Sequence, residues 1–145
     1  MAVASLGAQT KYEAMILNCI DPRFHVPLDE YAARQKLTGK FSQFTIAGAA
    51  IGVVAPAFNA WHQAFWDNLA ASIQLHSIPK VIVINHRDCG AARIAYGDAS
   101  IATPAAETET HRKAFAQFKA ELTKRHPKFG VETGLMSLDG KLEML

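Results

Sequence analysis

The stretch "KVIVINHRDCG", residues 80–90, decides the fold because it joins a strand to a short helix. Its four consecutive Val and Ile residues, 81–84, are typical of a strand that is covered on both faces. The next segment, "CGAARIAY" (89–96), is predicted to be a short helix. Strands and helices alternate on both sides of this stretch, which predicts an α/β fold with a mostly parallel sheet.

The remaining elements follow from apolar runs and from the residues that stop them. Further strands are expected at 12–18, at 40–48 and at the start of "VETGLMSLDGKLEML" (131–145), which continues into a turn and a tail. Further helices are expected at 27–37, 57–77 and 107–126. The segment "IATPAAETET", 101–110, is expected to be an exposed loop. The sequence thus predicts one domain, 1–145, with about four strands in the order 2-1-3-4 and helices on both faces.

The composition excludes several classes of protein. The chain has 145 residues, of which 50% are hydrophobic and 19% charged, as in a globular protein with a real core. A net charge of +2 is too small to indicate a nucleic acid or a membrane surface as the partner. No apolar run approaches the roughly 18 residues of a membrane span, and the first 15 residues do not resemble a signal peptide. We therefore expect a cytoplasmic protein.

The helix expected at 57–77 is unusually apolar and carries two stripes. The stripes consist of Phe58, Trp61, Phe65 and Leu69, and of Trp66, Leu69 and Ile73. Two interpretations are equally open: the helix lies between the sheet and another helix, or one stripe packs on a second subunit. The second interpretation predicts a homodimer or a higher homo-oligomer.

Three residues of metal-ligand type follow two of the predicted strands. Cys19 ends the first strand, and His86 and Cys89 follow the strand at 80–85. In the strand order 2-1-3-4 these two strands are neighbours, so their carboxyl ends meet where ligands bind in such sheets. Three ligands of the Cys2His type leave one zinc position open, which is typical of a catalytic rather than a structural site. Alternatives are that Cys19 is a buried core thiol, or that Cys19 and Cys89 form a disulfide or redox pair.

These residues resemble the β-class carbonic anhydrase family. That family carries Cys-x-Asp-x-Arg after its first strand and His-x-x-Cys-Gly after a later one, which stand here at 19–23 and 86–90. The likeness includes the pair Ala47-Gly48 and covers roughly residues 12–145. It implies reversible hydration of carbon dioxide to bicarbonate, with zinc-bound hydroxide as the nucleophile and a dyad of Asp21 and Arg23. It also implies that the Asp21 carboxylate can instead bind the metal and shut the site.

The chemistry gives each member of the dyad a role. Two thiolates cancel the charge of Zn²⁺, so the metal should acidify its water less than in a site with three histidines. Asp21 is placed to accept the water proton, and Arg23 can hold that carboxylate in a bidentate pair. We expect the pocket to be narrow and apolar, with Ile46 and Ala49 as walls and the Gly90 N–H binding a bicarbonate oxygen.

The chain departs from the family at several positions. Pro22 stands where Ser is usual, Thr45-Ile46 where Arg-Asn is common, and Ala49 where Asn is frequent. These departures leave the three expected zinc ligands unchanged and place the substrate in question. The alternatives are a hydrolase of carbonyl sulfide or carbon disulfide on the same site, a non-catalytic zinc-binding module, and a thiol redox protein.

Overall fold

The sheet has five strands and is mostly parallel, as a computed structural model that describes residues 11–145 shows. The strand order is β2-β1-β3-β4-β5, and only the β4–β5 pair is antiparallel. The predicted order 2-1-3-4 is confirmed, and the expected tail adds a fifth strand at one edge. The strands are β1 Ala14–Asn18, β2 Phe41–Thr45, β3 Lys80–His86, β4 Gly130–Met136 and β5 Leu142–Met144.

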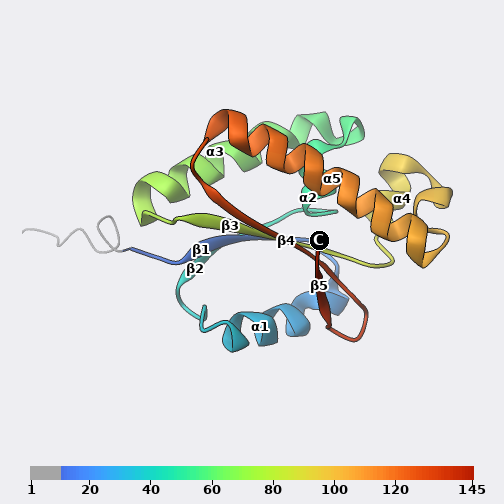
Figure 1. Ribbon diagram of the computed structural model, residues 1–145, viewed down its shortest axis with the longest axis horizontal. Coiled ribbons are helices and arrows are strands. Elements are labelled where there is room, and N and C mark those ends of the chain that lie inside the picture. Colours follow the sequence, from blue (N-terminus) through green and yellow to red (C-terminus); the bar gives the residue numbers. More distant parts are fainter. Residues whose placement is uncertain (1–10) are drawn as a thin grey trace, which may run out of the picture.

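Helices cover both faces of the sheet (Figure 1). One helix, α1 His25–Arg34, lies on one face, and α2 to α5 lie on the other. These four are α2 Ala50–Val54, α3 Asn59–His76, α4 Gly90–Tyr96 and α5 Pro104–Arg125. Three short 3-10 turns complete the described part of the chain: η1 Pro22–Phe24, η2 Pro56–Phe58 and η3 Asp98–Ile101.

The central strands divide their side chains between two cores because successive residues of a strand point to opposite faces. In β3, Val81 and Val83 join the core under α3 and α5, whereas Ile82 and Ile84 join the core against α1. All four side chains are almost completely buried. Burial of each contributes about 1.5–3 kcal/mol, so these two cores fix β3 and the turn that follows it.

Helix α3 lies between the sheet and α5, as the first interpretation of its apolar stripes proposed. Phe65 and Leu69 are fully buried, and Trp66 stacks on Phe118 of α5 at a ring distance of 5.4 Å. Among the residues of the two stripes, only the Trp61 side chain is exposed, at 37%. Packing within the subunit therefore accounts for most of the stripes. The homodimer stays a prediction.

The prediction of a loop at 101–110 is wrong. Helix α5 begins at Pro104, with Thr103 as its N-cap: the Thr103 hydroxyl accepts a hydrogen bond from the Ala106 N–H at 3.1 Å. Threonine at the N-cap and proline at the first helical position form a strong helix start. This signal outweighs the polar composition of the segment. As a result, the first turns of α5 lie against the turn that follows β3.

Two smaller differences concern the ends of elements. The strand expected at 40–48 ends at Thr45, and the short helix α2, which the sequence analysis did not predict, follows it.

Within residues 11–145, every helix is too short or too polar to cross a membrane. The prediction that the chain starts without a signal peptide falls mainly on residues 1–10, which lie outside the described residues.

Candidate metal centre

The three predicted ligands meet at one edge of the sheet. Cys19 follows β1, His86 ends β3, and Cys89 immediately precedes α4. Because β1 and β3 are parallel neighbours, their carboxyl ends lie side by side. One sulfur or ring nitrogen from each residue lies within 4.8 Å of the other two, so the group could hold a metal ion. His86 and Cys89 are only 2% and 1% exposed.

The imidazole of His86 is oriented for metal binding. Its Nδ1 donates a hydrogen bond to the Arg87 carbonyl at 2.7 Å, and its ring stacks on Phe24 with the centroids 4.1 Å apart. Nε2 therefore carries the lone pair and faces the two sulfurs. In the part of the chain that the structure describes, this Nε2 is one of two buried side-chain polar atoms without a hydrogen-bond partner. A buried acceptor of this kind is costly unless something binds it, and a metal ion would do so.

The two thiols are unequal. Contacts with the Cys89 thiol, with His86 and with the Gly48 N–H, the last at 3.2 Å, lower the pKa of Cys19. The contact with Cys19, together with burial, raises the pKa of Cys89. Cys19 therefore ionises more readily than Cys89. A divalent cation would favour the ionised form of both sulfurs.

Asp21 and Arg23 form the predicted ion pair beside the ligands. Arg23 Nη2 lies 2.8 Å from Asp21 Oδ2, Arg23 Nε lies 3.1 Å from Oδ1, and the Arg23 backbone N–H also donates to Oδ1. These bonds to Arg23 lower the pKa of Asp21 to about 2. Asp21 Oδ2 is 3.8 Å from His86 Nε2, so the carboxylate borders the space between the ligands. Pro22 begins the 3-10 turn that Asp21 caps.

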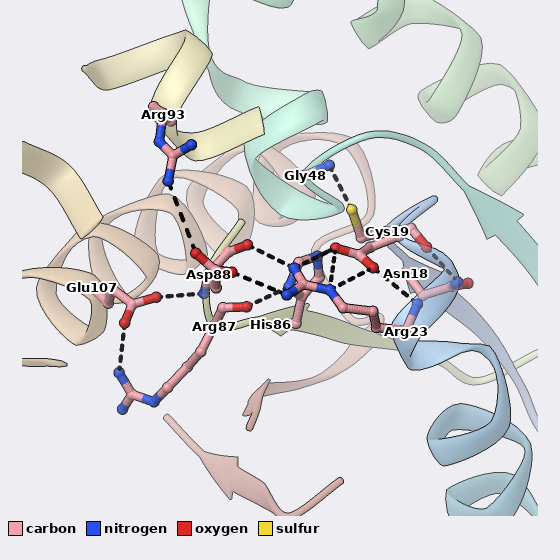
Figure 2. Close-up of polar contacts among 10 residues, drawn as sticks. Asn18, Cys19, Arg23, Gly48, His86, Arg87, Asp88, Arg93 and Glu107 are labelled. Atoms are coloured by element: carbon pink, nitrogen blue, oxygen red, sulfur yellow. Dashed lines mark hydrogen bonds and ion pairs between the residues drawn. The ribbon is translucent and has the colours of Figure 1, made fainter. Parts of the chain in front are cut away.

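Arg23 also binds the second ligand turn, a contact that the sequence analysis did not predict. Its Nη1 donates to Asp88 Oδ2 and its Nη2 to the Asp88 carbonyl, both at 3.0 Å (Figure 2). One guanidinium therefore links the turn after β1 to the turn between His86 and Cys89. Because its donors form a planar fork, Arg23 fixes both acceptors at once.

A cavity of about 310 Å³ opens beside Cys19 and Asp21. Its walls are more polar than expected: Asn18, Gln43 and Thr45 contribute to them, and the amide of Gln43 and the hydroxyl of Thr45 both donate to Asn18 Oδ1. These residues were missed, although the signal was present in the sequence. Gln43 and Thr45 alternate along β2, so they share the face of the sheet on which Asn18 lies.

The three predicted substrate contacts lie elsewhere around the metal centre. Ala49 is fully buried, Ile46 is partly buried against the core, and Gly90 is exposed at the first position of α4. The cavity beside Cys19 has none of them in its walls. Their roles stay predictions.

The fold and the site define an α/β protein with a mostly parallel sheet and a Cys-His-Cys group at the switch point that could hold a metal ion. Residues 9–129 match the model of the family described as "Putative carbonic anhydrase", and the chain belongs to this family. Two bacterial relatives are similar to the chain over 131 residues. An uncharacterized protein of Rickettsia bellii is 26% identical, over 90% of this chain and 80% of its own. An uncharacterized protein of Rickettsia conorii is 25% identical, over 90% and 70%.

Solved structures of β-carbonic anhydrases share the fold. CafA of the fungus Aspergillus fumigatus matches with a TM-score of 0.59 and 16% identity, over 94% of this chain and 76% of that one. A structure from work on two tetrameric β-carbonic anhydrases of Sordaria macrospora matches with a TM-score of 0.58 and 12% identity, over 94% and 81%. At these identities the likeness establishes the fold alone.

Proposed function

We propose that the protein catalyses the reversible hydration of carbon dioxide to bicarbonate and a proton, with Zn²⁺ held by Cys19, His86 and Cys89. One observation carries the proposal: the unpartnered Nε2 of buried His86 faces two thiols, within 4.8 Å, beside a carboxylate that Arg23 holds. Membership of the carbonic anhydrase family supports the reaction.

The donor set fits zinc. Thiolates and a neutral imidazole are the ligands that zinc prefers, and three protein ligands leave one of its four positions open. When bound, Zn²⁺ would supply a Lewis acid that lowers the pKa of a water molecule at that open position. The remaining steps depend on the side chains around it.

Asp21 would receive the proton that water loses. Its low pKa keeps it ionised at neutral pH, so the carboxylate orients an O–H group and passes the proton on rather than retaining it. Arg23, which binds both Asp21 oxygens, would keep the carboxylate out of the ligand position. The proton would leave through the cavity beside Cys19, where His25 lies in the wall.

For the substrate, we keep Gly90 as a proposed contact. Its backbone N–H follows ligand Cys89 directly, and no side chain caps the start of α4. This N–H could bind a bicarbonate oxygen. Ile46 and Ala49 would contribute only apolar walls deeper in the protein. We also propose a homodimer or higher oligomer in the cytoplasm; the related structures of Sordaria macrospora, described as tetrameric, support oligomerisation.

The test combines metal analysis with stopped-flow hydration of carbon dioxide. We expect one zinc per chain, lost in Cys19→Ser. Asp21→Asn should keep the zinc and lower the hydration rate about 10–100-fold, as expected for a residue that acts beside the ligands. Asp67→Asn, an exposed carboxylate on α3, is the matched control and should leave both values unchanged.

Three results would contradict the proposal. Zinc-loaded protein without hydration above the buffer rate from pH 7 to 9 would favour a hydrolase of a sulfur analogue or a non-catalytic zinc module. Metal-free protein with a Cys19–Cys89 disulfide would favour the redox interpretation. Unchanged hydration in Asp21→Asn would exclude the role given to that carboxylate.

A further inference from the structure

The turn between the second and third ligands has an unusual backbone. Only Arg87 and Asp88 separate His86 from Cys89, and Asp88 adopts a positive φ of 56°. Residues other than glycine rarely occupy this region, and they do so at a cost that surrounding contacts must offset. The turn therefore depends on contacts from outside itself.

Besides Arg23 and Arg93, which contact Asp88, the first turns of α5 supply these contacts (Figure 2). Glu107 Oε2 accepts a hydrogen bond from the Asp88 backbone N–H at 2.6 Å. Arg87 donates to the Thr108 hydroxyl at 2.8 Å and to the Pro104 carbonyl at 3.1 Å. Both residues of the turn are thus fastened to one helix.

Among the α5 residues that contact this turn, Glu107 is the buried carboxylate. It is only 9% exposed, although it is a carboxylate, and its second oxygen lies 3.9 Å from Arg87 Nη1. A buried carboxylate persists only where hydrogen bonds and opposite charge compensate its lost hydration. Here that compensation comes from the ligand turn and from the N-terminus of α5, where Glu107 lies in the first turn.

The same residue, Asp88, connects Glu107 to the dyad. While the Asp88 N–H binds Glu107, the Asp88 carbonyl and carboxylate bind Arg23, which in turn holds Asp21. A change in the backbone conformation of Asp88 would therefore displace Cys89 and loosen Arg23 together.

We propose that Glu107 is a positioning residue of the metal centre: its carboxylate fixes the Asp88 peptide, which sets the place of Cys89 and of the Arg23 fork. Its effect on the metal and on the dyad rests on the proposed function. The hydrogen bond to Asp88 can be tested without any metal.

The first experiment measures the rate of zinc release into a chromogenic chelator. We expect release from Glu107→Ala to be at least about tenfold faster than from wild type, in line with other residues that orient metal ligands. Glu107→Gln, which keeps an oxygen acceptor and the side-chain shape, should show a smaller increase and guards against a misfolded Ala variant. Glu109→Ala, on the same helix and paired with Arg112 at the surface, should match wild type.

A purely structural role would give a different result. In that case Glu107→Ala and Glu107→Gln would lower the melting temperature of the metal-free protein and leave zinc release unchanged. Such a result would overturn the proposal.

The second experiment separates this inference from the proposed function. Amide hydrogen exchange of Asp88, measured by NMR on metal-free protein, should be slow in wild type and more than about tenfold faster in Glu107→Ala. Rapid exchange in wild type would overturn the inference even if zinc and hydration were found. Slow exchange in a protein that binds no zinc would instead contradict the proposed function and leave the Glu107 bond established.

Discussion

The two turns that carry the proposed metal ligands are held in different ways. The turn after β1 is held mainly from within, since Asp21 and Arg23 are two residues apart, and Arg23 is 46% exposed. The turn after β3 is nearly buried at both proposed ligands and is held by Arg23 and by α5, which begins about 15 residues later in the chain. The comparison shows that local residues can shape an exposed half of a metal centre, whereas a buried half needs support from another element.

The largest expected effect concerns the core behind the second turn. His111 of α5 is fully buried, and its Nδ1 accepts a hydrogen bond from the Asn85 amide at 2.9 Å. Burial, together with the positive charge of Arg87, lowers the pKa of His111 to about 4. The folded protein therefore resists protonation at His111, whereas the unfolded chain takes up a proton near pH 6.5.

It follows that His111 contributes its full stability above about pH 6.5 and loses that contribution as the pH falls towards 4. The loss is on the order of 3 kcal/mol, because one pKa unit corresponds to about 1.4 kcal/mol. Urea unfolding at pH 4.5 and 7, compared with His111→Gln, should show a smaller pH dependence in the variant. An NMR titration that places the His111 pKa near 6.5 would contradict this account.

The next largest expected effect concerns Arg23, the residue that joins the two turns. In Arg23→Lys, a single ammonium cannot bind Asp21 and Asp88 in the fork geometry, although the charge is kept. We expect carbon dioxide hydration to fall about 10–100-fold while the zinc content stays at one per chain. Arg112→Lys, a surface arginine on α5, serves as the control. Full activity in Arg23→Lys would show that charge alone suffices and that the two turns do not depend on a shared side chain.

The smallest expected effect lies at the start of α5. Thr103→Ala removes the N-cap, so the free energy of unfolding should fall by about 1 kcal/mol in a urea titration. Thr123→Ala, near the end of the same helix, removes a hydroxyl that bonds only to the Lys119 carbonyl and should change stability by less than about 0.5 kcal/mol. Equal effects would mean that the helix start adds nothing to the support of the second turn.

The grouping of the three candidate ligands could be predicted because it follows from the predicted strand order by one rule. Parallel neighbours bring their carboxyl ends together, so Cys19 and His86 had to meet once β1 and β3 were recognised. The pair of Asp21 and Arg23 was equally accessible, because the two residues are close in sequence and opposite in charge. The ion pair lies within one short stretch of sequence, whereas the ligand group needs only the pairing of β1 with β3 in addition.

The support of the second turn could not be predicted in this way. The bonds from Glu107 and Arg23 to Asp88 join distant segments, and no local pattern indicates which acid accepts from a backbone N–H. Composition alone indicates a loop at 101–110, and only the Thr103-Pro104 pair indicates the helix. Alternation along β2 places Gln43 and Thr45 on one face, but their position beside Asn18 needed the register of β2 against β1.

The dependence of the ligand turn on α5 has a consequence for the nascent chain. All three ligand residues have been synthesised by residue 89, but the helix that fastens their turn spans Pro104–Arg125 and β4 follows it. During translation the three proposed ligands are therefore synthesised well before the segments that support their turn. Under the proposed function, a metal ion captured at that stage would meet a loosely ordered chain.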